Sequence, residues 1–150
     1  MLLFCKLLNN LLSLLQIHME TESDDLVQLK WDNFGNSMIA SFKKFHGEEK
    51  FCDVTLWTEK ESFKCHQVIL SASSSFFERI LSRNQGTSHA SVYLHGISSK
   101  SLRSLLIFMY EAELTISQED IPELLHVASV LEVKGLCKMG DDGGMAYCIS

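Results

Sequence analysis

The sequence predicts a single α+β domain, in which a small β-sheet is covered by a cluster of α-helices. Apolar residues make up 46% and charged residues 21% of the 150 residues, which are typical values for a globular domain. Some segments show the two-residue apolar period of strands, and others the three- to four-residue spacing of helices. Segments of the two kinds are mixed along the chain, as in a domain whose helices pack on a sheet.

The first predicted strand covers residues 26–31, LVQLKW. Val27, Leu29 and Trp31 alternate with polar residues, so one face of this strand is apolar. The neighbouring sequence offers no obvious second strand. We therefore expect this strand to need a sheet edge elsewhere to pair with.

A helix is expected over residues 32–47. Asp32 or Asn33 can cap its start, and Gly47 can end it. Spacings of four, four and three residues give it one apolar stripe. The stripe consists of Phe34, Met38, Phe42 and Phe45.

A hairpin follows, with strands over residues 51–58 and 63–65 and a turn between them. The first strand is rich in β-branched and aromatic residues, and Cys52, Val54 and Leu56 share one face. Two short helices are then expected over 66–72 and 74–82, with Ser73 or Ser74 as the break, because a serine hydroxyl can satisfy a free N–H at a helix start.

The last elements are a strand and two helices. Residues 83–90 read as a loop and 91–96 as a strand with Val92 and Leu94 inward. A helix over 99–112 follows, capped by Ser98, and another over 120–133. The first of these presents four apolar residues to the core: Leu102, Leu105, Leu106 and Met109. The second helix is expected to begin at Asp120, where Glu123 has capping-box spacing and Pro122 falls in the first turn. Residues 134–139 are a candidate for a final helical turn.

The two ends of the chain differ from the segment between them. Residues 1–25 are expected to be a disordered leader or a non-native extension, with Met19 as a plausible start and 1–18 dispensable. The longest uncharged run, residues 7–17, is shorter than the ~20 residues that span a bilayer, so no membrane segment is expected. Residues 139–150 are Gly-rich and are expected to be a short flexible tail.

Several residues suggest chemistry, but none forms a catalytic or metal-binding pattern. The cysteines are five in number and widely spaced, which favours neither a disulfide framework nor a zinc site; they are Cys5, Cys52, Cys65, Cys137 and Cys148. The adjacent Cys65 and His66 should point to opposite faces, so Cys65 is expected to be buried and His66 to anchor the strand–helix junction by a hydrogen bond. No cofactor, metal or enzyme activity is therefore expected. The formal charge of −6 also argues against direct binding of nucleic acid.

Asp53 lies in the middle of an apolar strand, where a carboxylate needs a partner. Two interpretations stay open. The carboxylate either bonds backbone groups at a strand end or forms part of a charged pocket.

Four stretches together resemble the BTB/POZ domain: FCDVTLW, CHQVILSASSSFFERIL, LLIFMYEAELTI and LLHVASVLEVKGL. The resemblance covers roughly residues 26–138. The preceding LKWDNFGNSM is similar to the L-R-W-N-N-H leader of the insect Tramtrack and Bric-a-brac group. Residues at the family's signature positions are His66, Leu70, Ala72, Ser74 and Phe77, with Tyr110 at the turn that the family writes Y-x-G-E.

The resemblance implies a protein–protein interaction module without enzymatic activity. Similar domains dimerise through an exchanged amino-terminal strand and the first helix. In this chain the corresponding residues are Val27, Leu29, Trp31, Phe34, Met38 and Phe42. The implied partners are the chain itself and other BTB proteins, with corepressors or a cullin as further candidates.

The Tramtrack group implies a developmental, nuclear transcription regulator, with the cytoplasm left open as a second location. A short isoform without a DNA-binding region would fit the chain. The alternative is a substrate adaptor of a cullin-based ubiquitin ligase, which would call for further helices and a substrate-binding domain.

Two positions depart from the family pattern. Gln67 stands where related domains carry Lys or Arg, so the charged pocket that Asp53 would form there lacks its cation. Ala112 stands where the family often has Gly. If that position needs a positive φ, alanine costs ~1 kcal/mol there.

Overall fold

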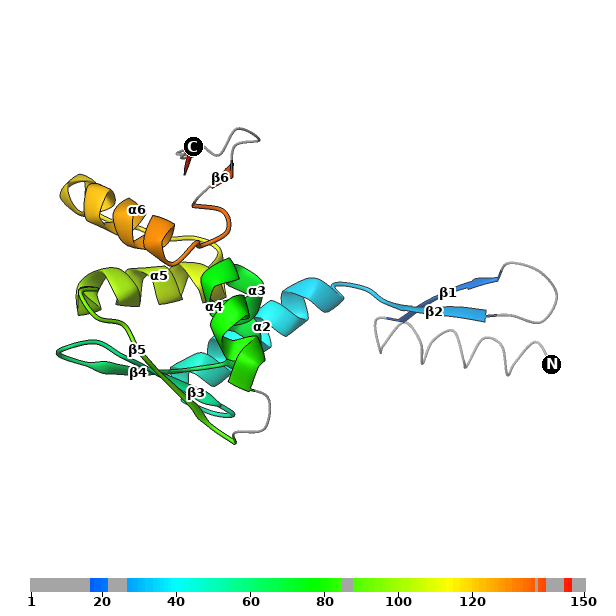
Figure 1. The fold of residues 1–150 in the computed structure, drawn as a ribbon. Helices are drawn as coiled ribbons and strands as arrows, with labels where there is room; N and C mark the ends of the chain where they lie inside the picture. The colour runs from blue at the N-terminus through cyan, green and yellow to red at the C-terminus, as the bar shows by residue number, and fades with distance from the viewer. Residues whose placement is uncertain (1–16, 22–26, 85–87, 137, 140–144, 147–150) are drawn as a thin grey trace, which may run out of the picture. The chain divides into compact units, whose positions relative to one another are not determined.

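The computed structural model describes residues 17–21, 27–84, 88–136, 138–139 and 145–146 (Figure 1). The chain divides into two compact units, residues 1–40 and 41–150. The first unit holds a β-hairpin, and the second holds a three-stranded sheet with its helices. Helix α2 (Phe34–Gly47) begins in the first unit and ends in the second.

The hairpin of the first unit pairs β1 (Ile17–Thr21) with β2 (Val27–Trp31) in antiparallel register. Ile17 lies opposite Trp31, and Thr21 lies opposite Val27. This corrects two expectations. The strand at 27–31 does have a partner nearby, and residues 17–21 of the expected disordered leader form a strand.

The sheet of the second unit has the order β4–β3–β5. Its strands are β3 (Val54–Trp57), β4 (Ser62–Cys65) and β5 (Ala90–Tyr93). β3 pairs with β4 as a hairpin and with β5 in parallel. A parallel pair needs a crossover connection, which here is the pair of short helices between β4 and β5.

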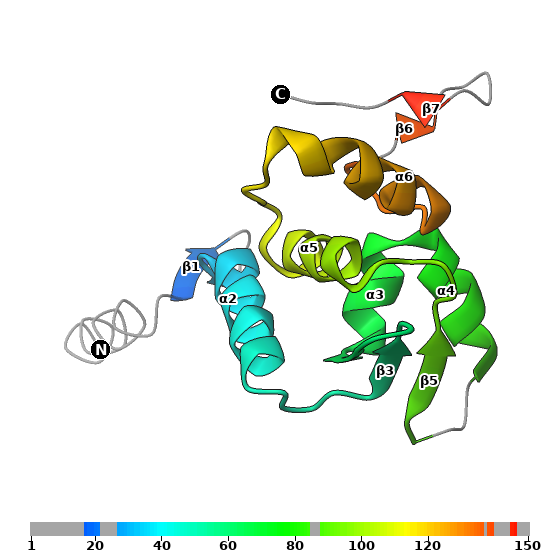
Figure 2. The ribbon, with the colours of Figure 1, turned by 90° about the vertical axis from the view of Figure 1, so that its left-hand side faces the viewer.

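The helices of the second unit lie over one face of this sheet (Figures 1 and 2). α3 (Gln67–Ser73) and α4 (Ser75–Leu81) form the crossover, and the 3₁₀ turn Ser82–Asn84 follows α4. α5 (Ser99–Glu111) lies between the sheet and α6 (Ile121–Val130), which begins after the 3₁₀ turn Gln118–Asp120.

Ser74 separates α3 from α4, as the sequence predicts. Its backbone is extended, and its hydroxyl accepts a hydrogen bond from the N–H of Phe77 at 3.1 Å. The same hydroxyl donates to the carbonyl of Leu131 at 2.6 Å. Ser74 therefore caps α4 and ties it to the end of α6, and it is completely buried.

The start of α6 differs in detail from the expected capping box. The Asp120 carboxylate makes no cap hydrogen bond; it accepts from the hydroxyl of Ser117 at 2.7 Å and pairs with Lys100 at 2.6 Å. Glu123 accepts from the hydroxyl of Ser98, which caps α5. The charged groups thus join the starts of α5 and α6 to each other.

The end of α6 also differs from the prediction. The helix ends at Val130, because Glu132 has a positive φ of 48° and Val133 forms a bridge with Ser74. Beyond it, β6 (Lys138–Met139) pairs with β7 (Met145–Ala146). The expected final helical turn over 134–139 is therefore wrong, and part of the expected flexible tail is a two-stranded ladder.

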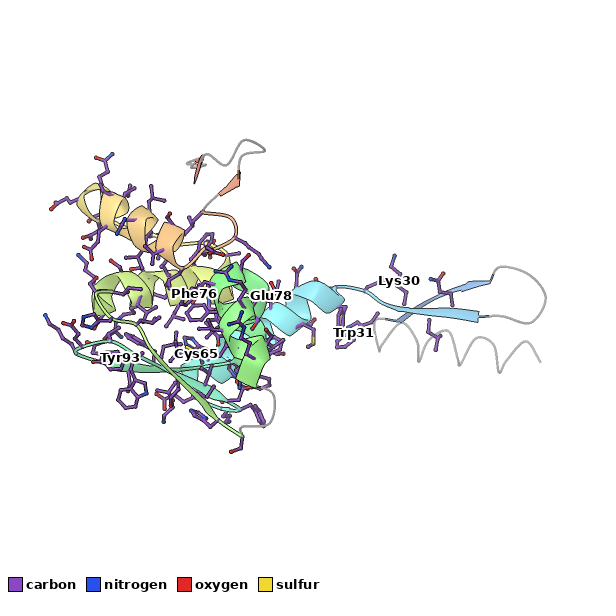
Figure 3. All side chains as sticks on the ribbon, viewed as in Figure 1. Lys30, Trp31, Cys65, Phe76, Glu78 and Tyr93 are labelled. Carbon is purple, nitrogen blue, oxygen red and sulfur yellow. The ribbon has the colours of Figure 1, made fainter. Side chains whose placement is uncertain are left out.

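The core lies between the sheet and the helices. Leu102, Leu105 and Leu106 are buried as predicted, and Met109 is half-buried beside them. Cys65 lies among the side chains packed between the sheet and the helices (Figure 3). Among the described residues, the hydrophobic ones that are completely buried are Val54, Leu56, Cys65, Leu70, Phe77, Leu102, Leu105, Ala128 and Val133.

Candidate interaction surface

Large apolar side chains are exposed in the first unit. Figure 3 shows Trp31 projecting from β2, and its ring packs edge-on against Phe34 with centroids 5.1 Å apart. Helix α2 has no buried residue among its 14 positions. The exposed fractions are 65% for Leu29, 50% for Trp31, 52% for Phe34 and 53% for Ile39. These four residues are called the 29–39 apolar surface below.

The second half of α2 is different, because it belongs to the second unit and its aromatic residues pack against other residues of that unit. Phe42 meets His66 edge-on at 6.0 Å, and Phe45 meets Phe51 at 5.1 Å. His46 stacks on Tyr110 with centroids 4.0 Å apart and planes 11° apart. Phe42, predicted at an interface between subunits, is thus half-buried against its own subunit.

His66 anchors the junction between β4 and α3 through both ring nitrogens. Its Nε2 lies 2.8 Å from the carbonyl of Lys50, and its Nδ1 lies 2.8 Å from the hydroxyl of Tyr110. A carbonyl only accepts, so Nε2 carries a proton, and in the Nε2–H tautomer Nδ1 accepts from the Tyr110 hydroxyl. The Tyr110 hydroxyl in turn accepts from the backbone N–H of His66 at 3.0 Å. The expected anchoring role of His66 is confirmed.

The ionisable groups of Cys65 and Tyr110 are shifted toward their neutral forms by burial. Burial raises the pKa of the Cys65 thiol to about 12, and burial likewise raises the pKa of Tyr110 above its ordinary value. A thiol held neutral in this way is not a nucleophile at neutral pH. The adjacent Cys65 and His66 therefore act as packing and hydrogen-bonding groups.

Asp53 and Gln67 lie together, as their candidacy for one pocket requires. The Asp53 carboxylate accepts from the backbone N–H of Gln67 at 2.7 Å, and the Gln67 side-chain amide donates to the carbonyl of Asp53 at 2.9 Å. Gln67 is the first residue of α3, so Asp53 caps this helix from the position just before β3 rather than from the middle of a strand. The interpretation of Asp53 as a partner for backbone groups is therefore confirmed. A charged pocket at this point stays a prediction.

The remaining signature residues have structural positions. Leu70 and Phe77 are completely buried, and Tyr110 is buried beside His66. Ala72 is exposed at the end of α3, where it lines a small cup together with Phe108 and Val133. These residues hold the two short helices against α5 and the segment after α6.

Sequence reasoning did not identify Ile39 or His46. Ile39 follows Met38 on α2 but lies off the stripe of Phe34, Met38 and Phe42, and its exposure marks it as part of the 29–39 apolar surface. His46 lies four residues beyond Phe42 on the same helix, and this spacing was the available signal for its contact with the core.

Metal-binding clusters and membrane-spanning helices are absent from the described residues. There, no three His, Cys, Asp or Glu side chains come together as a metal site would require. Within the same residues, no helix combines the length and apolar character needed to cross a bilayer. Cys52 and Cys65 are free thiols, and the other three cysteines lie outside the described residues.

The sequence and fold match known proteins. A family model described as the BTB/POZ domain matches residues 42–142. The BTB domain of zebrafish PATZ1 has a similar structure, with a TM-score of 0.62 and 26% identity over 76% of this chain and 89% of that chain.

Curated relatives come from Drosophila melanogaster. Protein abrupt is 36% identical over 130 residues, which is 87% of this chain and 14% of that protein. Longitudinals lacking protein-like is 39% identical over 77% of this chain and 91% of its own length. Protein tramtrack, alpha isoform, is 34% identical over 76% of this chain and 14% of that protein. The chain thus spans a small part of two of these relatives and nearly all of the third.

Proposed function

This chain belongs to the BTB/POZ domain family, and on that premise we propose that it is the oligomerisation module of a nuclear transcription regulator. Domains of this family are protein-interaction modules that associate with themselves and with other family members. Beyond this family property, we propose which surface of this chain makes the contact and that the association serves the regulation of transcription.

The 29–39 apolar surface carries the proposal. Four large side chains within eleven residues, each at least half exposed, form a patch of the kind that marks an interaction site. Two of them are aromatic, the residue class enriched at the centres of interfaces. Fully burying one such side chain contributes about 1.5–3 kcal/mol, so several together can offset the entropy of association.

Met38 adds to this surface from the same helix. It is half-buried in the single chain, and methionine adapts readily to irregular apolar contacts. Leu29 and Trp31 lie two residues apart on β2 and therefore share a face of the hairpin. We assign the partner contact to these residues, to Phe34 and to Ile39, and leave Phe42 to the subunit's own core.

The nuclear role rests on the resemblance to the Tramtrack group. The signature residues of the fold and the amino-terminal LKW segment both occur in this chain. The chain matches 91% of the length of Longitudinals lacking protein-like, a relative that is little more than this domain. It matches 14% of the length of Abrupt, in which the domain is part of a longer protein. Either form can regulate transcription by co-assembling with DNA-binding members of the family.

Co-expression in insect cells tests the proposal. Two copies with different tags are expected to be captured together from the nuclear fraction. Phe34→Glu combined with Ile39→Glu should abolish capture, because each charge would be buried without a partner. Val130→Glu, at an exposed apolar residue at the end of α6, is the matched control and should leave capture intact. The proposal would be contradicted if the two wild-type copies were not captured together, or if they stayed entirely outside the nucleus.

A further inference from the structure

The strand β4 is paired on one side only. The sheet order places β3 beside it and gives it no second neighbour in the described part of the chain. An edge strand presents backbone N–H and C=O groups that can pair with another extended chain.

The hydrogen-bond pattern identifies which backbone groups face outward. The N–H of Thr58 donates to the carbonyl of Glu61 at 2.9 Å, so these two residues form a hydrogen-bonded pair. Such pairs alternate along an antiparallel ladder, and residues between them point their backbone groups away from the partner strand. In β4 the outward residues are Ser62 and Lys64. Among the described residues, no turn, loop or side-chain hydrogen bond uses these backbone groups.

A groove follows this edge. Phe63 lies on the core face of the sheet and Lys64 on the opposite face, yet both line the groove. Trp57 and Tyr93 line it from the same face as Lys64, and they are register partners on β3 and β5. A groove whose lining comes from both faces of a sheet wraps around its edge. The last two residues of α2, His46 and Gly47, also line the groove, together with Glu49 just after the helix.

The charges of the groove are balanced by one another. Its lining holds the three cations Lys60, Lys64 and Arg103 and the three acids Glu49, Glu59 and Glu61. Lys64 pairs with Glu49 at 2.6 Å, and Arg103 pairs with Glu61. The groove also offers aromatic area, because Trp57 is 44% and Tyr93 63% exposed. Balanced charge and exposed aromatic rings favour an uncharged segment with apolar side chains.

A second copy of β4 fits this edge less well than a different peptide. Antiparallel pairing of two β4 strands would place Lys64 and its counterpart on the same face of the enlarged sheet. In a register that sets Lys64 opposite its counterpart, the two like charges would destabilise such pairing. An uncharged strand avoids that repulsion while using the same four backbone groups.

We propose that the outer edge of β4 binds an extended, uncharged peptide segment of a partner protein, which joins the sheet as an added strand. Backbone hydrogen bonds to Ser62 and Lys64 hold the segment. Alternate side chains of the segment contact Phe63 on one face and Trp57 on the other. This site uses none of the residues of the 29–39 apolar surface, so it stands or fails independently of the proposed oligomerisation.

The probe is a six-residue peptide that carries fluorescein on its N-terminus and an amide at its C-terminus, alternates threonine with valine, and includes one tyrosine. Fluorescence anisotropy measures its binding to the full chain. Ser62→Pro removes an outward N–H and blocks the edge, while the ladder to β3 keeps its hydrogen bonds. Ser91→Pro is the matched control. It changes the same residue type on β5, the other edge strand. The N–H of Leu94 donates to the carbonyl of Trp57 at 2.7 Å, so the alternate residue Ser91 directs its backbone N–H outward, away from β3 and from the groove.

Binding should weaken by about tenfold or more in Ser62→Pro and by less than about twofold in Ser91→Pro. The same peptide with every amide N-methylated should not bind wild-type protein, and this result does not depend on how the proline variants fold. In hydrogen exchange, the peptide should slow the amides of Ser62 and Lys64. Equal binding to Ser62→Pro, binding of the N-methylated peptide, or no binding at millimolar concentration would overturn the proposal. Concentration-dependent protection of these two amides without peptide would show a second copy at the edge, and would overturn it too.

Discussion

Tyr110 and His66 are joined by two hydrogen bonds that run in opposite directions. The Tyr110 hydroxyl accepts from the backbone N–H of His66 at 3.0 Å and lies 2.8 Å from its Nδ1, to which it donates. These bonds fix the end of the β3–β4 hairpin to α5. His46 of α2 stacks on the same tyrosine, so one ring connects three elements of the second unit.

Tyr110→Phe should lower the free energy of unfolding by about 1–3 kcal/mol. The variant keeps the ring but leaves a buried backbone N–H and a ring nitrogen without partners, which costs more than a surface hydrogen bond. Urea denaturation measures the change. Tyr93→Phe, at an exposed ring, is the control and should stay within about 0.5 kcal/mol of wild type. Equal stability of the Tyr110 variant would show that water replaces the hydroxyl.

Ser74→Ala should destabilise the protein by about 2–3 kcal/mol. It removes the cap of α4 and also leaves the buried carbonyl of Leu131 without its donor. Ser75→Ala, one residue further on, removes a hydroxyl that has no hydrogen bond among the described residues. Thermal unfolding of the two variants should separate them clearly, and matching melting temperatures would refute the double role of Ser74.

Ala112→Gly should raise the free energy of unfolding by about 1 kcal/mol. Ala112 ends α5 with φ at 60°, a left-handed conformation that glycine adopts without steric cost. Ala72→Gly, within the helix α3, is expected to have the opposite sign and lose about 0.5–1 kcal/mol. Chemical denaturation of both variants checks the prediction, which fails if the substitution at 112 destabilises.

Acidification should weaken the contact of α2 with the core through His46. Burial, and then the nearby His66, lower the pKa of His46 below its ordinary value of 6.5, against smaller opposing effects of Glu111 and Glu49. The unfolded chain therefore takes up this proton at higher pH than the folded chain does. This contribution to stability is present above pH 6.5 and is lost as the pH falls through the lower pKa of the folded state.

His46→Phe keeps an aromatic ring on Tyr110 and removes the titration. Urea denaturation at about pH 7.5 and pH 5.5 gives the free energy of unfolding at each pH. The decrease between the two pH values should be smaller for the variant than for wild type. Parallel loss in the two proteins would assign the acid sensitivity to other groups. Circular dichroism at each pH checks that both start from the same fold.

Much of the second unit follows from local patterns in the sequence. The stripe of Leu102, Leu105 and Leu106 and the alternation of Val54 with Leu56 each predict one buried face, and the structure confirms both. Ser74 could be placed because a cap residue between two apolar segments is a local signal. Such elements depend mainly on their own residues.

Features that depend on distant partners escaped prediction. The strand of residues 17–21 follows a leucine-rich segment and becomes recognisable only through its pairing with β2. Phe42 has the spacing of an interface residue, but His66, 24 positions further along the chain, packs against it. The early end of α6 results from the bridge between Ser74 and Val133, which no helical pattern contains.

The mass of the purified chain in solution tests the central claim most directly. Light scattering at micromolar concentration should give at least twice the 17.0 kDa of one chain. Phe34→Glu with Ile39→Glu should give a folded monomer, because both side chains are exposed in the single chain and their loss removes only partner contacts. Val130→Glu should keep the wild-type mass. A wild-type chain that is monomeric, or a double variant that retains the oligomer with unchanged circular dichroism, would contradict the assignment of the 29–39 apolar surface.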